Sequence, residues 1–234
     1  KFKFNSLVCK NENLSHEYKD VKCFKNIESL FSSKINDCIY VAAMPQTNLN
    51  VVQEAVKNNI PLIIEKPISD SYLSAIKLSE ISNNNNLIVL PNVTNFFSKN
   101  FLQIKNFIKK NINNIEKIIL YEGSFGPFRK QIHPIWDWGF HPLSLLIQLF
   151  NYENFSDISI KEIKKDNKYD FSLVCKFEFL INSKIKVKIV TGNCFKRKIR
   201  KIKILLNNNN YFINDMLNHK SYLNINLVFQ NNIS

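Results

Sequence analysis

Three short apolar runs, about 25 residues apart, constrain the fold of this chain more than any other feature. Continuous apolar runs of four to six residues are typical of strands that are covered on both faces of a sheet. The segments between them place apolar residues at helical spacing, and alternating strands and helices predict parallel pairing with right-handed crossovers. FNSLVC at 4–9 adds an earlier strand of the same kind. The runs are CIYVAA at 38–43, PLII at 61–64 and LIVL at 87–90.

The pattern changes from about residue 115 onward. Five segments alternate apolar and polar residues, which predicts an antiparallel sheet with one packed and one exposed face. One strong helix, HPLSLLIQLF at 141–150, interrupts them. We therefore predict an α/β Rossmann-like parallel sheet in residues 1–92, followed by an α+β domain with an open antiparallel sheet in residues 93–234. The five segments are IEKIILYEG, DISIKEIKK, DFSLVCKFEFLI, KIKVKIVTG and RKIKILL.

The net charge of +13 raises the possibility of a basic nucleic-acid-binding domain. Only three of the 32 basic residues are arginines, and asparagine and isoleucine are enriched together with lysine, which indicates a general compositional bias. We expect no nucleic-acid partner, and we keep that domain type as an alternative. No apolar run approaches the roughly 20 residues that a membrane span needs, so we expect no membrane partner. The five cysteines lack metal-ligand spacing, which predicts buried free thiols in the cytoplasm and no metal site.

A charged pair and a proline end the second apolar run, in IPLIIEKPISD at 60–70. Ligands of parallel α/β sheets bind beyond the carboxyl ends of the strands. AAMPQTN at 42–48 follows the neighbouring strand and is expected on the same rim. There the Lys66 ammonium can neutralise charge on a substrate oxygen, with Glu65 fixing the ammonium group and Pro67 restricting the next φ angle.

Two motifs together resemble one known family. AAMPQTNLNVVQEAVKNNIPLIIEKP at 42–67 and DWGFH at 137–141 resemble the marks of the Gfo/Idh/MocA oxidoreductases, the relatives of glucose–fructose oxidoreductase and inositol dehydrogenase. The resemblance implies an NAD(P)-dependent oxidoreductase that acts on the hydroxyl or carbonyl of a sugar, sugar nucleotide or polyol. It also implies a homo-oligomer formed through the C-terminal sheet.

The resemblance assigns Lys66, Asp137 and His141 as the catalytic group. A histidine with a near-neutral intrinsic pKa suits the base that takes the hydroxyl proton, the lysine suits the cation beside the incipient alkoxide, and the aspartate can orient the substrate. We expect the trio to meet at one substrate hydroxyl. The candidates for substrate contact are Asn92, Trp136 and Asp137, and those for cofactor contact are Lys10, Ala43, Pro45, Asn48, Glu65 and Lys66.

Several departures from the family pattern leave questions open. All four glycines lie after residue 122, so we expect the first strand, the glycine-rich phosphate loop and its helix to lie upstream of Lys1, and the chain to be a fragment. Lys10 follows the strand where an acidic residue marks NAD preference, which favours NADP, but the choice between NAD and NADP stays open. A catalytically silent Rossmann-like binding or sensor protein remains the main alternative to the enzyme.

Overall fold

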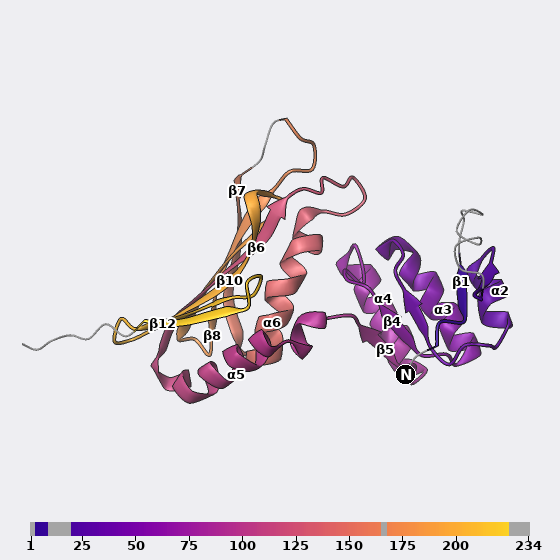
Figure 1. Ribbon diagram of the computed structural model, residues 1–234, viewed down its shortest axis with the longest axis horizontal. Helices are drawn as coiled ribbons and strands as arrows, with labels where there is room; N and C mark the ends of the chain where they lie inside the picture. The colour runs from indigo at the N-terminus through magenta and orange to yellow at the C-terminus, as the bar shows by residue number, and fades with distance from the viewer. Residues whose placement is uncertain (1–2, 9–19, 165–167, 225–234) are drawn as a thin grey trace, which may run out of the picture. The chain divides into compact units, whose positions relative to one another are not determined.

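The computed structural model describes residues 3–8, 20–164 and 168–224 (Figure 1). The chain divides into two compact units, Lys1–Val93 and Thr94–Ser234, and each is described here by itself.

Unit 1 is an α/β unit with parallel strands. β3, β4 and β5 form a three-stranded parallel sheet in that order, and β1 and β2 form a separate two-stranded parallel sheet. This confirms the predicted Rossmann-like parallel sheet. The elements are β1 (Ser6–Val8), β2 (Lys22–Phe24), α2 (Ile27–Ser32), β3 (Ile39–Val41), η1 (Pro45–Thr47), α3 (Asn48–Asn58), β4 (Leu62–Ile64), α4 (Tyr72–Asn84) and β5 (Val89–Pro91).

The core of unit 1 forms where α3 and α4 pack on the three-stranded sheet. Val52 and Ala55 of α3 are fully buried, as is Ile64 of β4. α3 ends where Asn59 adopts the left-handed conformation, with φ of 51°, which is a common way for a helix to stop. β4 begins three residues later, at Leu62, and Glu65 and Lys66 directly follow the end of β4.

Unit 2 begins with a helix that the sequence pattern did not predict and is built on a seven-stranded sheet. The strand order is β12-β11-β10-β6-β9-β8-β7. Its elements are η2 (Thr94–Phe97), α5 (Lys99–Asn111), η3 (Ile112–Asn114), β6 (Ile115–Phe125), the π-helical turn η4 (Ile135–Gly139), α6 (Phe140–Phe150), η5 (Tyr152–Asn154), β7 (Phe155–Lys164), β8 (Val174–Ile181), β9 (Ile185–Gly192), β10 (Cys194–Leu206), β11 (Tyr211–Asp215) and β12 (Lys220–Asn224).

The sheet of unit 2 confirms the predicted α+β domain, with one refinement. β6 and β9 pair in parallel, whereas every other neighbouring pair of this sheet is antiparallel. The chain leaves β6, runs through α6 and returns as the β7–β8–β9 meander. The last strand of that meander therefore lies beside β6 in the same direction.

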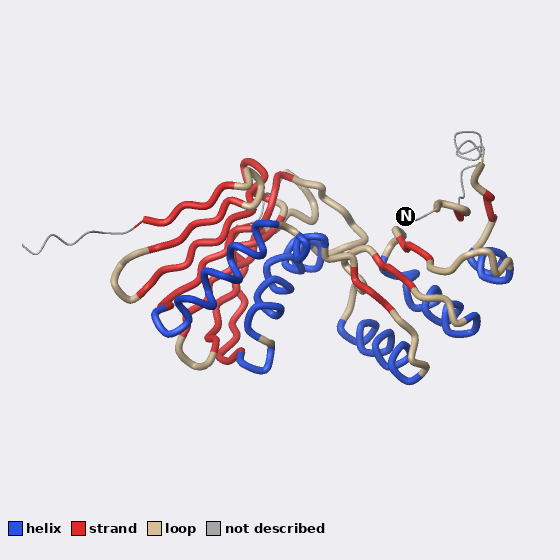
Figure 2. The backbone as a smooth tube through the Cα atoms, turned by 60° about the horizontal axis from the view of Figure 1, so that its bottom comes forward, coloured by secondary structure: helices blue, strands red, loops and turns tan. Residues whose placement is uncertain are grey.

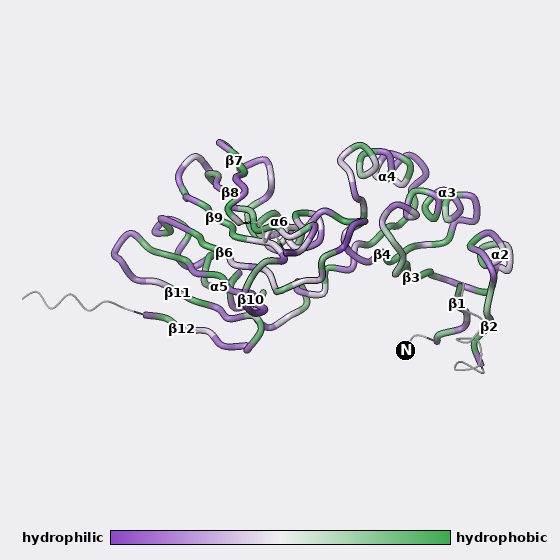
Figure 3. The backbone as a smooth tube through the Cα atoms, turned by 90° about the horizontal axis from the view of Figure 1, so that it is seen from above, coloured by the Kyte–Doolittle hydropathy of each residue, from purple (hydrophilic) through white to green (hydrophobic). Residues whose placement is uncertain are grey.

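Helices α5 and α6 lie along one face of this sheet (Figure 2). Ile118 and Leu120 of β6 point to that face and are buried with Leu146 of α6. Apolar and polar residues alternate along the strands (Figure 3), so the opposite face carries side chains such as Lys117. This one-sided burial is what the alternating pattern predicts.

The cysteines only partly follow the prediction of buried thiols. Cys175 and Cys194 are buried, whereas Cys23 and Cys38 are exposed. Both exposed residues lie in or beside three-residue strands of unit 1, too short to bury every apolar position. Within the described ranges, no group of three or more His, Cys, Asp or Glu side chains could hold a metal ion, and no helix there is long and apolar enough to cross a bilayer.

Candidate active site

The carboxyl ends of β3, β4 and β5 form an ordered rim in unit 1. The Glu65 N–H donates to the carbonyl of Val41, and the Asn92 N–H donates to the carbonyl of Ile64, both at 2.8 Å. Glu65 directly follows β4 and Asn92 directly follows β5, so the backbone hydrogen bonding between the parallel strands continues for one residue past the strand ends. Glu65 and Asn92 therefore start from backbone positions that the sheet fixes.

The Glu65 carboxylate accepts hydrogen bonds from two of its neighbours on this rim. The Tyr40 hydroxyl donates to Oε1, and Asn92 Nδ2 donates to the same oxygen at 2.5 Å. Asn92 Nδ2 also lies 2.9 Å from the Tyr40 hydroxyl. The rim thus carries a three-residue polar group, one residue from each strand or strand end. Glu65 and Asn92 are predicted site residues, and Tyr40 is not.

The polar group holds Glu65 in its charged form. Partial burial acts to raise the pKa of Glu65. The hydrogen bonds from Tyr40, Asn92 and the Lys66 backbone N–H, together with the Lys66 charge, outweigh it and leave the pKa below its ordinary value. The same hydrogen bond to Glu65 raises the pKa of Tyr40, with smaller contributions from burial and from the Glu65 charge. The rim therefore presents an anion next to the Lys66 ammonium.

Lys66 follows this fixed anion and is half-buried. The Lys66–Pro67 peptide bond is cis, and Pro67 is buried. The backbone on both sides of Lys66 is thus held, by the Glu65 carboxylate before it and by a buried ring after it. This is the kind of support that keeps a catalytic cation in place.

The turn after β3 is tied to the segment that follows Lys66. Asn48 is 1% exposed, and its Nδ2 donates to the Ile68 carbonyl at 2.7 Å. Pro45 is buried and Ala43 is exposed. Asn48 therefore joins the two loops of the rim through its amide, and Ala43 is the more accessible of the predicted cofactor contacts in this turn. Lys10 lies outside the described residues.

Asp137 lies in unit 2, in the π-helical turn that precedes α6. The carbonyl of His133, two residues before the turn, accepts hydrogen bonds from the N–H groups of Trp136 and Asp137 at 2.9 and 3.3 Å. Single π turns are frequent at functional sites. Gly139 is buried at the end of the turn, and an added Cβ would make ordinary contacts with Ile135 Cγ2 at 3.6 Å and with Thr191 Cγ2 of β9 at 3.7 Å.

His141 lies in the first turn of α6, directly after the π turn. Its ring is half-buried and its Nδ1 atom is buried. Asp137 is 7% exposed, and Trp136 beside it is 37% exposed. The structure thus places Asp137 and His141 on one continuous helical segment and leaves Trp136 accessible to a ligand.

Arg129 is a further residue of this site that the motifs did not indicate. Its guanidinium Nη1 lies 3.6 Å from Asp137 Oδ2, with the arginine half exposed and the aspartate side chain 10% exposed. The only signal in the sequence is its residue type, because arginine is rare in this lysine-rich chain. Arg129 gives Asp137 a cationic neighbour from the loop that follows β6.

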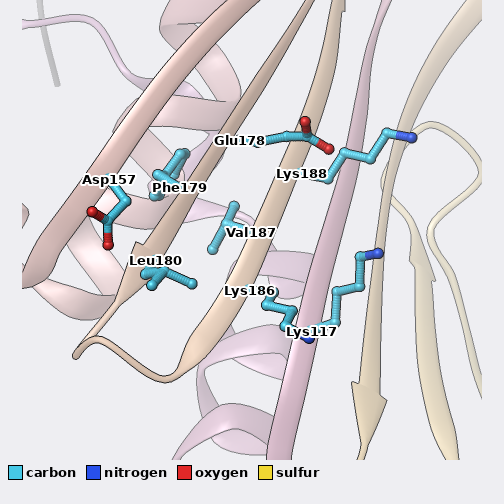
Figure 4. A pocket seen from close by; sticks show the side chains of 8 residues that line it. All are labelled: Lys117, Asp157, Glu178, Phe179, Leu180, Lys186, Val187 and Lys188. Atoms are coloured by element: carbon cyan, nitrogen blue, oxygen red, sulfur yellow. The ribbon is translucent and has the colours of Figure 1, made fainter.

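A surface depression of about 300 Å³ lies elsewhere on unit 2 (Figure 4). Two of its lining residues, Lys117 and Lys186, are paired across β6 and β9. They lie six residues along these strands from the pair Gly123 and Gly192, which is at the end of the strands near the π turn. None of the predicted site residues lines it. The lining residues are Lys117, Asp157, Glu178, Phe179, Leu180, Lys186, Val187 and Lys188.

The comparisons with known proteins agree with this geometry. Residues 7–93 match the family model GFO_IDH_MocA, described as an oxidoreductase family with an NAD-binding Rossmann fold. This part of the chain is similar to the NAD-binding Rossmann domain of the Gfo/Idh/MocA oxidoreductases. The match covers the rim with Glu65, Lys66 and Asn92, and it agrees with the predicted resemblance and with an NAD-type cofactor for this domain. No curated protein sequence matches the chain.

Solved structures of several oxidoreductases extend the likeness in fold to most of the chain. The UDP-N-acetylglucosamine 3-dehydrogenase of Acidithiobacillus ferrooxidans is 15% identical, with 90% of this chain and 67% of that one covered and a TM-score of 0.72. The myo-inositol 2-dehydrogenase of Lactobacillus plantarum is 10% identical, with 90% and 68% covered and a TM-score of 0.76. An Agrobacterium radiobacter oxidoreductase in complex with NAD+, L-tartaric acid and magnesium is 11% identical, with 94% and 71% covered and a TM-score of 0.73.

At such low identities, these TM-scores show a shared fold and nothing further. The chain spans about two thirds of the length of these structures. Asp137 and His141 lie beyond the family-model match, and the meeting of Lys66 with them at one substrate stays a prediction.

Proposed function

We propose that this chain provides the substrate-handling part of an NAD(P)-dependent oxidoreductase that acts on a hydroxyl or carbonyl group of a sugar, sugar nucleotide or polyol. The observation that carries the proposal is the Lys66 rim, where Tyr40 and Asn92 fix the Glu65 carboxylate next to the lysine. An ordinary surface Glu–Lys pair would not be expected to have two further hydrogen-bond partners, from neighbouring strands, on its carboxylate.

The dinucleotide would lie along the carboxyl rim of the parallel sheet. Ala43, Pro45 and Asn48 of the first turn, with Glu65 and Lys66 of the second, are the residues proposed to contact it. Residues 1–93 contain no glycine, so the glycine-rich turn that holds a pyrophosphate is not among them. When bound, the cofactor accepts or supplies the hydride of the reaction.

The residues of this chain would handle the proton and the charge. As the substrate alcohol is oxidised, His141 takes the hydroxyl proton, and the Lys66 ammonium stabilises the negative charge that develops on the oxygen. Asp137, held in the π turn beside Arg129, hydrogen-bonds neighbouring substrate hydroxyls and fixes the ring. Asn92 and the accessible Trp136 are proposed to contact the substrate further out.

Two solved relatives support a polyhydroxylated substrate. One is a dehydrogenase of UDP-N-acetylglucosamine and another of myo-inositol. Both names describe the oxidation of a secondary alcohol on a six-membered ring. A lysine, an aspartate and a histidine can together handle the proton and the charge of that reaction. A carbohydrate role in the cytoplasm, and a homo-oligomer through the open sheet face of unit 2, belong to the same proposal.

The proposal is tested by turnover assays of the full protein with NAD+ and NADP+ against myo-inositol, free hexoses and nucleotide sugars. Formation of reduced nicotinamide is followed by its absorbance. Turnover that vanishes in Lys66→Ala and in His141→Ala supports the enzyme. Binding of dinucleotide by calorimetry with no turnover of any alcohol would favour the silent binding or sensor protein instead.

A further inference from the structure

Three aromatic rings form a cluster where β6 ends in unit 2. Phe128 and Tyr169 stack with ring centroids 4.6 Å apart and planes 12° apart. Phe125 meets both rings edge-on, at centroid distances of 5.3 and 5.4 Å. Phe125 nevertheless remains 51% exposed. The cluster is therefore preassembled by its own ring contacts while leaving an aromatic surface open, and the proposed catalytic steps do not use it.

A buried asparagine fastens together the two loops that carry these rings. Asn193 is 1% exposed, and its Nδ2 donates to the carbonyls of Pro127 and Phe171 at 3.2 and 3.0 Å. Its Oδ1 accepts the N–H of Leu173 at 2.8 Å, and its carbonyl accepts the N–H of Gly126 at 2.8 Å. Both loops are thus pinned to one residue, which fixes the ring cluster to the end of β9.

Gly192 allows the close approach that this fastening needs. Its φ is 151°, and an added Cβ would lie 2.0 Å from the Leu173 carbonyl oxygen. A side chain at this position would force the β9 end away from the loop before β8. The cluster is thus part of the sheet architecture and not a chance contact of surface loops.

Three cations lie close to the cluster along the chain or along the paired strand, and they include two of the three arginines of the chain. Arg129 follows Phe128 directly and also lies 3.6 Å from Asp137. Arg197 lies in an exposed, irregular stretch of β10 that starts at Cys194, the residue paired with Phe125. Lys168 Nζ lies 5.8 Å from the centre of the Tyr169 ring. Arginine binds phosphate with two parallel hydrogen bonds, which lysine cannot reproduce.

We infer that this rim of unit 2 binds the nucleoside diphosphate part of a nucleotide-activated sugar, an inference that rests on the proposed function and narrows its substrate class. An exposed ring beside a fixed stacked pair suits the flat face of a base. The neighbouring guanidinium groups suit a diphosphate. Arg129 connects this rim with the proposed site of oxidation. It follows Phe128 of the ring cluster in the sequence, and its guanidinium lies beside Asp137, where the sugar hydroxyl would be oxidised.

The inference is tested by calorimetric titration of the full protein with UDP and GDP. Saturating NAD+ is present throughout, so that the dinucleotide site is not the one observed. Uridine and inorganic pyrophosphate, titrated separately, resolve the base and phosphate contributions. We expect at least one nucleoside diphosphate to bind, and each fragment alone to bind more weakly.

Matched variants then assign the binding to the cluster. Phe125→Ala should weaken nucleoside diphosphate binding by about 10- to 100-fold, the loss expected for one base-stacking ring. Phe125→Tyr keeps the ring and should bind like the natural protein. Phe97→Ala is the control, because Phe97 is 86% exposed in η2 of the same unit. Arg197→Ala should weaken UDP and pyrophosphate binding and leave uridine unaffected.

The outcomes separate this inference from the proposed function. Absence of UDP and GDP binding, or equal binding by Phe125→Ala and the natural protein, would overturn the inference, and turnover of free inositol in that case would leave the oxidoreductase standing. Cluster-dependent binding of a nucleoside diphosphate without turnover of any alcohol would support the inference and defeat the proposed function.

Discussion

The two groups of predicted site residues, one in each unit, are built in different ways. In unit 1, the polar group of Tyr40, Glu65 and Asn92 is placed by the ends of three parallel strands, each of three residues. In unit 2, Asp137 lies in a π turn that contacts β9 through Gly139 and is flanked by Arg129, and His141 lies in the first turn of α6. The first arrangement depends on the pairing of strands whose polar residues are 25 to 52 positions apart in the sequence. The second depends on a local helical turn.

This difference predicts whether a substitution in each unit affects activity or stability first. A strand end holds its side chain as long as the sheet is intact, so changes at the unit 1 rim should alter chemistry and spare stability. A π turn is kept by its packing, so changes in the buried contacts of unit 2 should alter stability first. The predictions below test that contrast, from the largest expected effect to the smallest.

Replacing Lys66 with alanine should have the largest effect on activity. Loss of a cation that stabilises a developing oxyanion, and that shares its proton, costs on the order of 10²–10⁴-fold in turnover. The melting temperature should hardly change, because the rim hydrogen bonds of Glu65 come from other side chains and from the backbone. Steady-state kinetics and thermal unfolding measure the two quantities.

Lys57→Ala is the matched control for this variant. Lys57 is an exposed lysine of the same unit, on α3, paired with Glu54 at 2.5 Å. It should leave turnover unchanged. A small change in turnover for Lys66→Ala, accompanied by a large fall in melting temperature, would show that Lys66 is structural and that the contrast between the two groups is wrong.

Replacing Arg200 with leucine should strongly destabilise unit 2. Arg200 Nε lies 2.7 and 2.9 Å from the Glu122 carboxylate oxygens, and its Nη1 donates to Asn95 Oδ1 at 3.1 Å. Glu122 is 2% exposed, so losing its partner leaves a buried charge that costs about 3–5 kcal/mol. Chemical denaturation gives the free energy of unfolding.

The double variant Glu122→Leu and Arg200→Leu makes this prediction specific. Removing both charges should restore part of the lost stability, because an apolar pair no longer leaves an unpaired carboxylate. If the single and double variants are equally unstable, lost packing and not the buried charge explains the effect.

The sequence predicted unit 1 and its rim better than unit 2, for physical reasons. Continuous apolar runs fix strands that are covered on both faces, so the positions of Glu65 and Lys66 follow from the run that precedes them. The partnership of Tyr40 with Glu65 could not be predicted, because Tyr40 sits inside an apolar run and reads as a strand residue. Its hydroxyl is relevant only once β3 and β4 are known to be in register.

In unit 2 the helix α6 and five strands were predictable, but their irregularities were not. The apolar spacing of Phe101, Ile104 and Ile108 is helical and could have revealed α5. The π turn at Asp137 could not have been recognised from spacing, because nothing in the segment IWDWG distinguishes a π turn from the start of an α-helix. The parallel pairing of β6 with β9 likewise depends on the order of strands and not on any single strand.

Replacing Tyr40 with phenylalanine should have a moderate effect on activity. The ring remains and the hydrogen bond to Glu65 is lost, which is worth about 1 kcal/mol, or roughly fivefold in turnover. The pKa of Glu65 should rise, because one of the hydrogen bonds that lower it is gone. Kinetics across pH would detect both. An unchanged pH profile and rate would show that the polar group does not support Lys66.

The smallest expected effect is on the acid side of the stability profile, and it compares the two units directly. The pKa of Glu65 is lowered from 4.5 in unit 1, and that of Asp215 is lowered from 3.8 in unit 2. Burial opposes the shift of Asp215, but hydrogen bonds from Asn218 and Lys201 and the Lys201 charge, with Lys201 Nζ at 3.2 Å, prevail.

A carboxyl whose folded pKa is lowered stabilises the fold above its unfolded pKa, and that stabilisation is lost as the pH falls through the folded pKa. Glu65→Gln should therefore flatten the loss of stability below about pH 4.5, and Asp215→Asn the loss below about pH 3.8. Both changes should be small, because Glu65 is partly exposed and the Lys201 partner of Asp215 has a side chain that is 42% exposed. If the two units unfold in separate steps, each variant should alter only the step of its own unit. Identical effects of both variants on a single transition would show that the two units unfold together, and that the contrast between them concerns function alone.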